Sequence, residues 1–589
     1  MKKLAKVLSL ALVLVMVLSL GGTAWAAGSH TVTINKDSTD KATHIYEAYQ
    51  IFSGDYDSAT ATLSNIEWGT GINKSAFVTD LRSVFGTNST ASSIVKTPAA
   101  AEDNPATTEV DETQPVMYTI GELFTEADTA EKVAQAISEL NAAADSENAQ
   151  KLAEIAGKNL NTTTSGTSGT SVTGLPDGYY LIKDKDASLD NVENGAYTKF
   201  ILQVVGDVTV NEKASVPSVV KKVKDKDDTA GTETGYQDSA DYDIGDAVPF
   251  QITGTTSSKA GEYFKYHVTF TDDQSDGLDA PETFEVSVLG QNLSLNNAAN
   301  ASATATVGEI KVTATVITAG ADFAIKVAFE NTDNDGKASD ALNWVKLGSD
   351  VASKPIVITY TSVLNSSAKF GSAGNPNTVY MKYSNNPNSK DDSTEGKTPE
   401  DKVIVFTYKP VITKTKADGS ALSGAGFTLY KQVASGGQTG AQIKNALSSE
   451  NSSINAAALE DSKNYVALAM TQQSGSENVF EFKGIDDGTY VLVETTIPAG
   501  YNAFESKKIV VSATHDETSD DPALTALTGG DLLTGNVSTG ELTGTVINQQ
   551  GNQLPSTGGI GTTLFYVFGS MLVIAAGVYF VTKKRSDID

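Results

Sequence analysis

The side chains that most often carry catalysis or bind metals are few and scattered in this sequence. The four histidines, His30, His44, His267 and His515, lie far apart and lack the spacing of a zinc site or a histidine-based triad. No glycine-rich phosphate loop and no G-x-S-x-G elbow occurs. The acidic cluster at residues 225–228 is interpreted as a solvated loop rather than a metal site. We therefore expect a protein that is not an enzyme and that has no metal site and no cofactor.

One motif near the C-terminus is of a different kind, because an LPSTG stretch precedes an apolar run and a basic cluster. From Ile560 to Thr582 no charged residue occurs, enough for a helix to span a hydrocarbon core of roughly 30 Å. The basic residues 583–585 then hold that end in the cytoplasm. A transmembrane helix accounts for the tail but not for the motif itself, which consists of Leu554, Pro555, Ser556, Thr557 and Gly558.

The N-terminus reads as a secretory signal peptide. Lysines precede an apolar stretch from Val7 to Leu20, and Ala24-Trp25-Ala26 provides the small residues of a cleavage site after Ala26. A first membrane helix is the alternative, which the short apolar run disfavours. Residues 27 to about 553 are therefore expected outside the membrane.

The exported part is long enough for three or four domains and contains no cysteine. Exported domains are often stapled by disulfides, so any covalent reinforcement here must use other residues. The net charge of −29 argues against nucleic acid and anionic membrane surfaces as partners.

An internal repeat links the two ends of the exported part. GLPDGYYLI begins at Gly174 and GIDDGTYVLVE begins at Gly484, and both read as a tight turn followed by a half-buried strand. Between them, strand patterns follow one another without helices, which is typical of a β-sandwich. In the first region, Asp128 and Glu131 are expected to cap a helical insertion that starts before Val133.

These patterns predict an all-β protein of tandem immunoglobulin-like (Cna-type) sandwiches, with the helical insertion in the first. The expected limits are 1–26 for the signal peptide, 27–215, 216–408 and 409–550 for the first, middle and last domains, and 551–589 for the sorting signal, transmembrane helix and basic tail.

Taken together, the chain resembles the sortase-assembled backbone (major) pilins of Gram-positive bacteria along nearly its whole length. LPSTG matches the L-P-x-T-G sorting signal, which sortase cuts between Thr557 and Gly558. The resemblance implies that the acyl group of Thr557 passes to a lysine of the next subunit. The membrane tail would hold the chain until that cleavage.

The acceptor lysine of this family lies in a V-Y-P-K-N pattern at the end of the first domain. The matching stretch here is VNEKA at residues 210–214, which keeps only the valine and the lysine, so the resemblance implies Lys213 as the acceptor. Lys222 and Lys224 are the alternatives. Ala214 takes the position of a cross-linking asparagine, so although Lys36 and Asp184 are available, no intramolecular bond is predicted in the first domain.

The last domain resembles the Cna B-type fold through KTKADGSALSGAGFTLY, GTYVLVETTIPAGY and TVIN. The resemblance implies an isopeptide bond between Lys414 and Asn548, with Glu494 as the acid.

The middle domain resembles the D2 (Cna A-like) type through VVKKVKD, TDDQSDGL and YSNNP. For this domain the resemblance implies Lys221, Asp272 and Asn385.

Strand alternation tests the six residues independently, because each must share a face with its apolar neighbours two positions away. All six do so, as Lys221 does with Val219 and Val223. The burial that this implies suits the chemistry, since it lowers a lysine pKa by up to roughly 3–5 units and keeps a carboxylic acid protonated. The acid can then stabilise the oxyanion and transfer protons as ammonia leaves. A buried salt bridge beside an amide, with no covalent bond, is the alternative.

The sequence therefore predicts a structural subunit of a covalent, cell wall-anchored fimbria. Its implied partners are pilus-specific and housekeeping sortases, further copies of itself, peptidoglycan, accessory pilins and a host surface ligand. The alternative is a monomeric wall-anchored adhesin that binds a host protein or glycan and has no need of Lys213.

Overall fold

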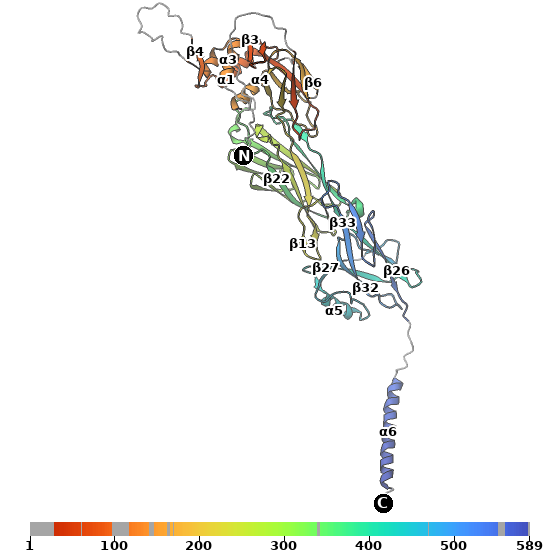
Figure 1. Cartoon of the computed structure of the whole chain (residues 1–589). Helices are drawn as coiled ribbons and strands as arrows, with labels where there is room; N and C mark the ends of the chain where they lie inside the picture. Colours follow the sequence, from red (N-terminus) through yellow and green to blue (C-terminus); the bar gives the residue numbers. More distant parts are fainter. Residues whose placement is uncertain are drawn as a thin grey trace, which may run out of the picture.

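The computed structural model describes residues 29–60, 62–96, 117–140, 146–161, 165–168, 170–338, 342–468, 471–551 and 560–586. Three β-rich parts follow one another in chain order along one long axis, with a C-terminal helix beyond the last (Figure 1). Strands hold 45% of the residues and helices 15%, so the predicted class of tandem β-sandwiches is confirmed.

The first domain has two main sheets and a cover of helices. One sheet has the order β10 (Val208–Asn211), β1 (His30–Asn35) and β7 (Ser171–Leu175). The other has the order β3 (Thr62–Trp68), β2 (Ile45–Asp57), β8 (Gly178–Asp184) and β9 (Ile201–Val205), with β6 (Ser165–Ser168) also beside β2. A separate pair is formed by β4 (Ala91–Val95) and β5 (Met117–Thr119). The helices are α1 (Lys74–Phe85), α2 (Ile120–Glu126), α3 (Ala130–Glu139) and α4 (Glu147–Lys158).

Strand β8 shows how these layers fit together, because all seven of its residues are buried. Tyr180 and Ile182 enter a core shared with the sheet of β1. Tyr179 and Leu181 point the other way, into a core filled by helices α1 to α4. A strand covered on both faces is apolar at successive positions, as the repeat sequence is here.

The predicted helical insertion is present, but its cap differs from the expectation. Helix α3 begins after Thr129, whose side chain accepts a hydrogen bond from the backbone of Lys132. The carboxylate of Asp128 lies one residue too early for this role and pairs instead with the Lys132 ammonium at 2.8 Å.

The middle domain is a sandwich of two sheets around one large core. One sheet has the order β11 (Ser218–Val223), β15 (Ala247–Thr255), β22 (Pro355–Val363), β17 (Thr283–Val288) and β18 (Gln291–Asn296). The other runs β14 (Ser239–Asp241), β25 (Asp401–Phe406), β23 (Asn375–Ser384), β16 (Lys265–Gln274), β21 (Phe323–Asn331), β20 (Ile310–Thr318) and β19 (Ser302–Val307), with β24 (Glu395–Lys397) also on β23. A short hairpin of β12 (Lys226–Asp227) and β13 (Thr232–Glu233) projects from it.

The last domain is a second two-sheet sandwich. One sheet has the order β30 (Thr471–Gln472), β31 (Val479–Glu481), β26 (Lys409–Lys416), β36 (Glu541–Asn548) and β35 (Thr534–Asn536). The other has the order β28 (Gln438–Thr439), β29 (Asn464–Leu468), β27 (Gly426–Val433), β32 (Gly488–Thr496), β33 (Lys507–His515) and β34 (Leu524–Thr528). Helix α5 (Gly440–Glu450), which the sequence analysis did not predict, packs beside β29 on a small core of its own.

The two copies of the internal repeat adopt the same local structure. Each begins at a glycine with positive φ, Gly174 or Gly484, where a residue with a Cβ would be strained. In each, the strand tyrosine donates its hydroxyl proton to the carbonyl four residues earlier, from Tyr180 at 2.9 Å and from Tyr490 at 3.1 Å.

Charged side chains join the middle and last domains. The Lys431 ammonium lies 2.7 Å from Asp228, 2.7 Å from Asp243 and 2.8 Å from Asp486. The interpretation of residues 225–228 as a solvated loop was therefore wrong in part. Asp228 is half-buried because the hairpin that carries it packs against the last domain.

Helix α6 (Ile560–Ser586) covers the stretch expected to cross the membrane, and its side chains are described from Tyr566 to Tyr579. Among the described residues, no helix is both long and apolar enough to cross a membrane. The signal peptide (residues 1–26) and the LPSTG motif lie outside the described residues.

Candidate functional site

The three predicted residues of the last domain lie together in its core. Lys414 and Glu494 are fully buried and Asn548 is nearly so. The Lys414 Nζ lies 3.6 Å from Glu494 Oε1, and the Asn548 amide nitrogen donates to both Glu494 oxygens at 2.8 and 2.9 Å. The sequence folds them together because β26 and β36, the first and last strands of the domain, are parallel neighbours with Lys414 opposite Val546 and Lys416 opposite Asn548.

The environment of this site suits a neutral amine. Burial lowers the pKa of Lys414, although the charge of Glu494 acts in the opposite direction. Glu494 is held in position because its Oε2 also accepts a hydrogen bond from the backbone of Phe504 at 2.8 Å. The carbonyl oxygen of Asn548 is buried without a hydrogen-bond partner, which is unusual for a native polar atom.

In the middle domain, Lys221 and Asp272 form a buried ion pair. The Lys221 ammonium contacts Asp272 Oδ2 and donates to the Tyr360 hydroxyl at 2.7 Å, and that hydroxyl lies 3.2 Å from both Asp272 oxygens. Burial lowers the pKa of Lys221 and raises the pKa of Asp272 to about 6. The predicted lysine and acid are therefore brought together, with Tyr360 as a third member that the sequence analysis did not identify.

The predicted third residue, Asn385, is not part of this site. On strand β23 the partner of Asp272 is Val379, whereas Asn385 follows the end of that strand. The Asn385 amide donates to the carbonyl of Leu189 at 2.8 Å, and its backbone carbonyl accepts from Tyr197 at 2.7 Å. Asn385 thus connects the middle domain to the first domain, and its assignment as a cross-linking residue is corrected.

Asn377 has the geometry that was expected of Asn385. It is fully buried on β23, opposite Gln274 and two positions from Val379. Its amide nitrogen donates to the same Tyr360 hydroxyl at 2.9 Å, and its carbonyl oxygen has no hydrogen-bond partner, as in Asn548. Asn377 and Asn385 share one face of the strand, so alternation alone allows both and only the register separates them.

The first domain contains no corresponding lysine–acid–asparagine set among its predicted residues. Lys36 donates to the backbone carbonyl of Ala42. Asp184 accepts from His44 and from the backbone of Thr198. Ala214 is buried where the family has its asparagine.

The three lysines considered as subunit acceptors differ in their surroundings. Lys213 is half-buried between β10 and β11, and its backbone is fixed by hydrogen bonds with the Thr198 hydroxyl at 3.0 Å and the Lys199 amide at 3.3 Å. The ammonium of Lys222 contacts Asp238, and that of Lys224 lies 3.4 Å from Glu233.

Comparisons with known proteins agree with the motif and the fold. Residues 409–522 match SpaA, a prealbumin-like fold domain, and residues 547–587 match the LPXTG cell wall anchor motif. Over 423 residues the chain is 24% identical to the trypsin-resistant surface T6 protein of Streptococcus pyogenes serotype M6, an alignment that covers 64% of this chain and 70% of that protein.

Solved structures of major pilins are also similar to this chain. The T6 backbone pilin of serotype M6 Streptococcus pyogenes has a TM-score of 0.45 at 16% identity, covering 90% of this chain and 100% of that one. The full-length major pilin SpaD from Corynebacterium diphtheriae has a TM-score of 0.40 at 14% identity, covering 89% and 98%.

The anchor match defines the chain as a cell wall-anchored surface protein. Within that class it resembles the sortase-assembled backbone pilins, which are structural subunits and not enzymes, in agreement with the resemblance noted in the sequence. The anchor motif and the pilin relative together support a sortase-anchored pilus subunit.

Proposed function

We propose that this protein is the repeating unit of a covalent surface fimbria, in which each Thr557 is joined to Lys213 of the next subunit and two domains are closed by lysine–asparagine isopeptide bonds. The observation that carries this proposal is the buried Lys414–Glu494–Asn548 set, which bridges the first and last strands of the last domain. The predicted limits 27–215, 216–408 and 409–550 are the proposed structural units of the shaft.

The bond in the last domain forms without any cofactor. The neutral Lys414 amine attacks the side-chain carbonyl carbon of Asn548, and the amide nitrogen leaves as ammonia. Half a turn of the amide brings its oxygen against Glu494 in place of its nitrogen, where Glu494, once it has taken a proton from the Lys414 ammonium, donates to the developing oxyanion. Glu494 then transfers the proton lost by the amine to the departing nitrogen. The fixed strands supply the proximity that the reaction requires.

In the middle domain the proposed bond joins Lys221 to Asn377, in place of Asn385. The support for this pair is that both side chains hydrogen-bond one Tyr360 hydroxyl while Asp272 contacts the lysine. Asp272, whose pKa is raised to about 6 by burial, acts as the proton carrier. Tyr360 positions the amine and the amide and takes no part in the bond.

The joining of subunits is a transpeptidation. Sortase breaks the Thr557–Gly558 peptide bond and holds Thr557 as an acyl-enzyme, and the amine of Lys213 then displaces the enzyme to form one new amide. Lys213 is favoured because it takes the position of the family's acceptor lysine at the end of the first domain, within residues 210–214. Lys213 also precedes β11, so tension from the neighbouring subunit would enter the middle domain on the strand that carries Lys221, whose proposed bond crosses to Asn377 on β23.

The test is an immunoblot of muramidase-released wall extracts boiled in SDS, comparing wild type, Lys213→Ala and the matched control Lys222→Ala. We expect a high-mass ladder in wild type and control that collapses to the monomer in Lys213→Ala. A ladder that survives in Lys213→Ala would move the acceptor to another lysine. A single wall-linked monomer in every lane, with the pilus-specific sortase present, would overturn the fimbria and support the monomeric adhesin.

A further inference from the structure

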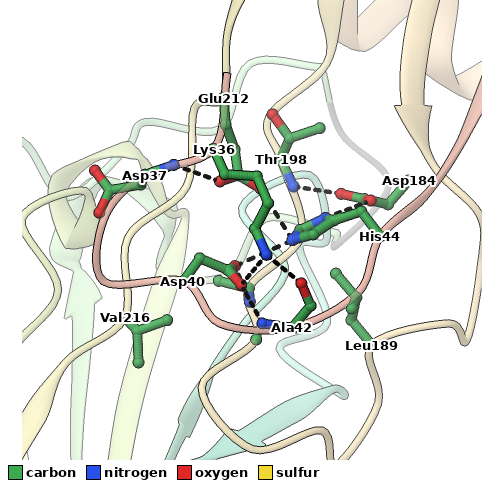
Figure 2. Close-up of polar contacts among 12 residues, drawn as sticks. Lys36, Asp37, Asp40, Ala42, His44, Asp184, Leu189, Thr198, Glu212 and Val216 are labelled. Carbon is green, nitrogen blue, oxygen red and sulfur yellow. Dashed lines mark hydrogen bonds and ion pairs between the residues drawn. The ribbon is translucent and has the colours of Figure 1, made fainter. Parts of the chain in front are cut away.

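A buried polar cluster in the first domain plays no part in the proposed covalent chemistry. His44 lies at its centre, surrounded by Asp40, Asp184 and Glu212 (Figure 2). The exposed fractions of these residues are 1% for His44, 3% for Asp40, 2% for Asp184 and 7% for Glu212. Buried charges need compensation, so three carboxylates around one imidazole require a cationic partner.

The protonation of the imidazole is fixed by one of the three acids. His44 Nδ1 lies 2.8 Å from Asp184 Oδ1. Since a carboxylate accepts hydrogen bonds, Nδ1 carries a proton and Nε2 is the nitrogen available to a ligand. Asp184 is itself held by the backbone amide of Thr198, which donates to its second oxygen at 2.7 Å. Histidines that bind metals typically donate their other ring N–H to a carboxylate, as His44 does to Asp184.

His44 Nε2 faces two carboxylate oxygens but makes no hydrogen bond. It lies 3.1 Å from Glu212 Oε1 and 3.3 Å from Asp40 Oδ2, and it is a buried atom without a hydrogen-bond partner. These three atoms lie within 4.8 Å of one another. Around a cation with bonds of roughly 2.1 Å, neighbouring ligand atoms are separated by roughly 3.0–3.4 Å, which matches both distances.

Both acids are oriented by backbone amides, one of which bonds the Asp40 Oδ2 that faces Nε2. The second Glu212 oxygen accepts from the amide of Asp37 at 2.9 Å, and Asp40 accepts from the amides of Ala42 at 2.8 Å and Ala196 at 3.0 Å. The oxygens that face Nε2 are therefore positioned by the fold.

We propose that the first domain binds one first-row divalent cation, of the Zn²⁺ type, through Asp40, His44 and Glu212. One imidazole nitrogen with two carboxylate oxygens suits such an ion, whereas Ca²⁺ takes six to eight oxygens. The charge also fits, because the three carboxylates have one nearby ammonium, that of Lys36 at 3.8 Å from Asp40. A neutral imidazole and a doubly charged ion would then balance the cluster.

The site ties together the parts of the domain that an isopeptide bond would otherwise join. Asp40 and His44 belong to the segment between β1 and β2, and Glu212 follows β10, which pairs with β1 in parallel. The cation would close this junction in the domain where Ala214 replaces the cross-linking asparagine. This inference is independent of subunit polymerisation.

The competing occupant is a proton on Nε2. Burial alone lowers the pKa of His44, but its contacts with Asp184, Asp40 and Glu212 raise that pKa to about 10. An imidazolium in this position would donate to Asp40 or Glu212, so the two possibilities make different predictions for metal content and for the Nε2 ligand.

The experiment uses the full chain purified in detergent, treated with a chelator, checked for folding by circular dichroism and then titrated with Zn²⁺. We expect one equivalent of zinc by elemental analysis, at least tenfold weaker binding in Glu212→Gln, and loss of binding in His44→Gln. The matched control is His30→Gln, because His30 also lies beside acids, Asp177 and Asp207, but is partly exposed. Its zinc content should equal that of wild type.

A measurement on the wild type keeps the test valid if the buried variants fail to fold. Zinc X-ray absorption should show one imidazole nitrogen among oxygen ligands, both in wild type and in a His515→Gln chain, because His515 with Asp225 and Asp241 offers a second set of this composition. Folded wild-type protein that takes up no stoichiometric zinc would overturn the proposal and make His44 an imidazolium. A zinc spectrum without imidazole would also overturn it, since the bound ion would then lie elsewhere.

Discussion

Replacing the acid of the last domain, Glu494→Gln, should prevent its isopeptide bond while leaving Lys414 and Asn548 present. The bond would close a loop from residue 414 to residue 548. For a loop of about 135 residues, the entropy lost by the unfolded chain corresponds to a stabilisation of about 5 kcal/mol. For a domain of this size, that loss lowers the melting temperature by roughly 10–20 °C.

Two measurements on the same sample test this reasoning. Mass spectrometry of the intact chain should show that the variant keeps one ammonia that the wild type has lost, and calorimetry should show the shift confined to one transition. The matched control is Glu481→Gln, because Glu481 is a buried acid of the same domain whose partners are Lys409 and Lys483. The control should lose the same ammonia as wild type. A Glu494→Gln chain that has lost the same ammonia as wild type would refute the role of this acid, and a variant that lacks the bond but melts at the wild-type temperature would refute the magnitude.

Four further outcomes follow from the geometry. Asn377→Ala should abolish the loss of ammonia from the middle domain, whereas Asn385→Ala should leave it intact, as peptide mapping of the cross-linked fragment would show. In the Asn377→Ala chain, Asp272 keeps its pKa of about 6, above the unfolded value near 4. Between these two pH values the folded state binds more protons than the unfolded state, so the free energy of unfolding should fall as pH rises from about 4 to about 6. Urea titrations should show this slope, and an added Asp272→Asn change should remove it. Chelator should lower the melting temperature of the first domain in wild type but not in His44→Gln, by calorimetry with and without zinc. Lys431→Met leaves the three acids between the middle and last domains without their cation, and removing one partner of a buried ion pair costs about 3–5 kcal/mol. The hairpin at residues 226–233 should then detach from the last domain and be cleaved faster by protease. An unchanged rate of proteolysis would contradict this prediction.

The fold could be predicted from the sequence because its signals are local. Alternating apolar residues mark the strands, and the repeated D-G-x-Y turn marks two of them in related positions. Helix α5 was missed because its apolar face is short, with Ile443 and Leu447 as its buried large residues. The cap of α3 was misassigned by one residue, since Asp128 and Thr129 are both suitable N-caps and only the backbone geometry selects between them.

The candidate sites were less predictable because they depend on register and on long-range contacts. Alternation correctly turned Lys221 and Asp272 inward, but it could not choose between Asn377 on β23 and Asn385 just after its end, which are eight residues apart and have the same alternation phase. Only the pairing of Asp272 with Val379 settles which end of the strand meets the ion pair. The sequence does contain an asparagine directly before the strand sequence TVYMKY, namely Asn377, but without the strand register nothing marks it as the partner of Lys221.

The cluster around His44 illustrates the same limit more strongly. Its ligands are brought together by a loop between β1 and β2 and by the segment after β10, which are separated by most of the first domain. The spacing of Asp40 and His44 resembles one helical turn, yet these residues lie in a loop, so a search for helical ligand pairs does not find them. The absence of regular ligand spacing around a histidine in the sequence is therefore only weak evidence against a metal site, because parallel pairing of distant strands can supply the third ligand.

The order of strands determines how a fibre of this kind would bear load. In the last domain, tension would enter through β26 and leave through β36 toward Thr557, and these two strands are direct parallel neighbours. A bond between Lys414 and Asn548 would therefore carry the force across one strand spacing, and the other strands of the sandwich would remain outside the load path. In the first domain the load would bypass the helices and the sheet of β2 altogether, because Lys213 follows β10 and leads directly into β11. The first domain thus needs only enough stability to stay folded beside the shaft, a requirement that a noncovalent junction at Asp40, His44 and Glu212 can meet.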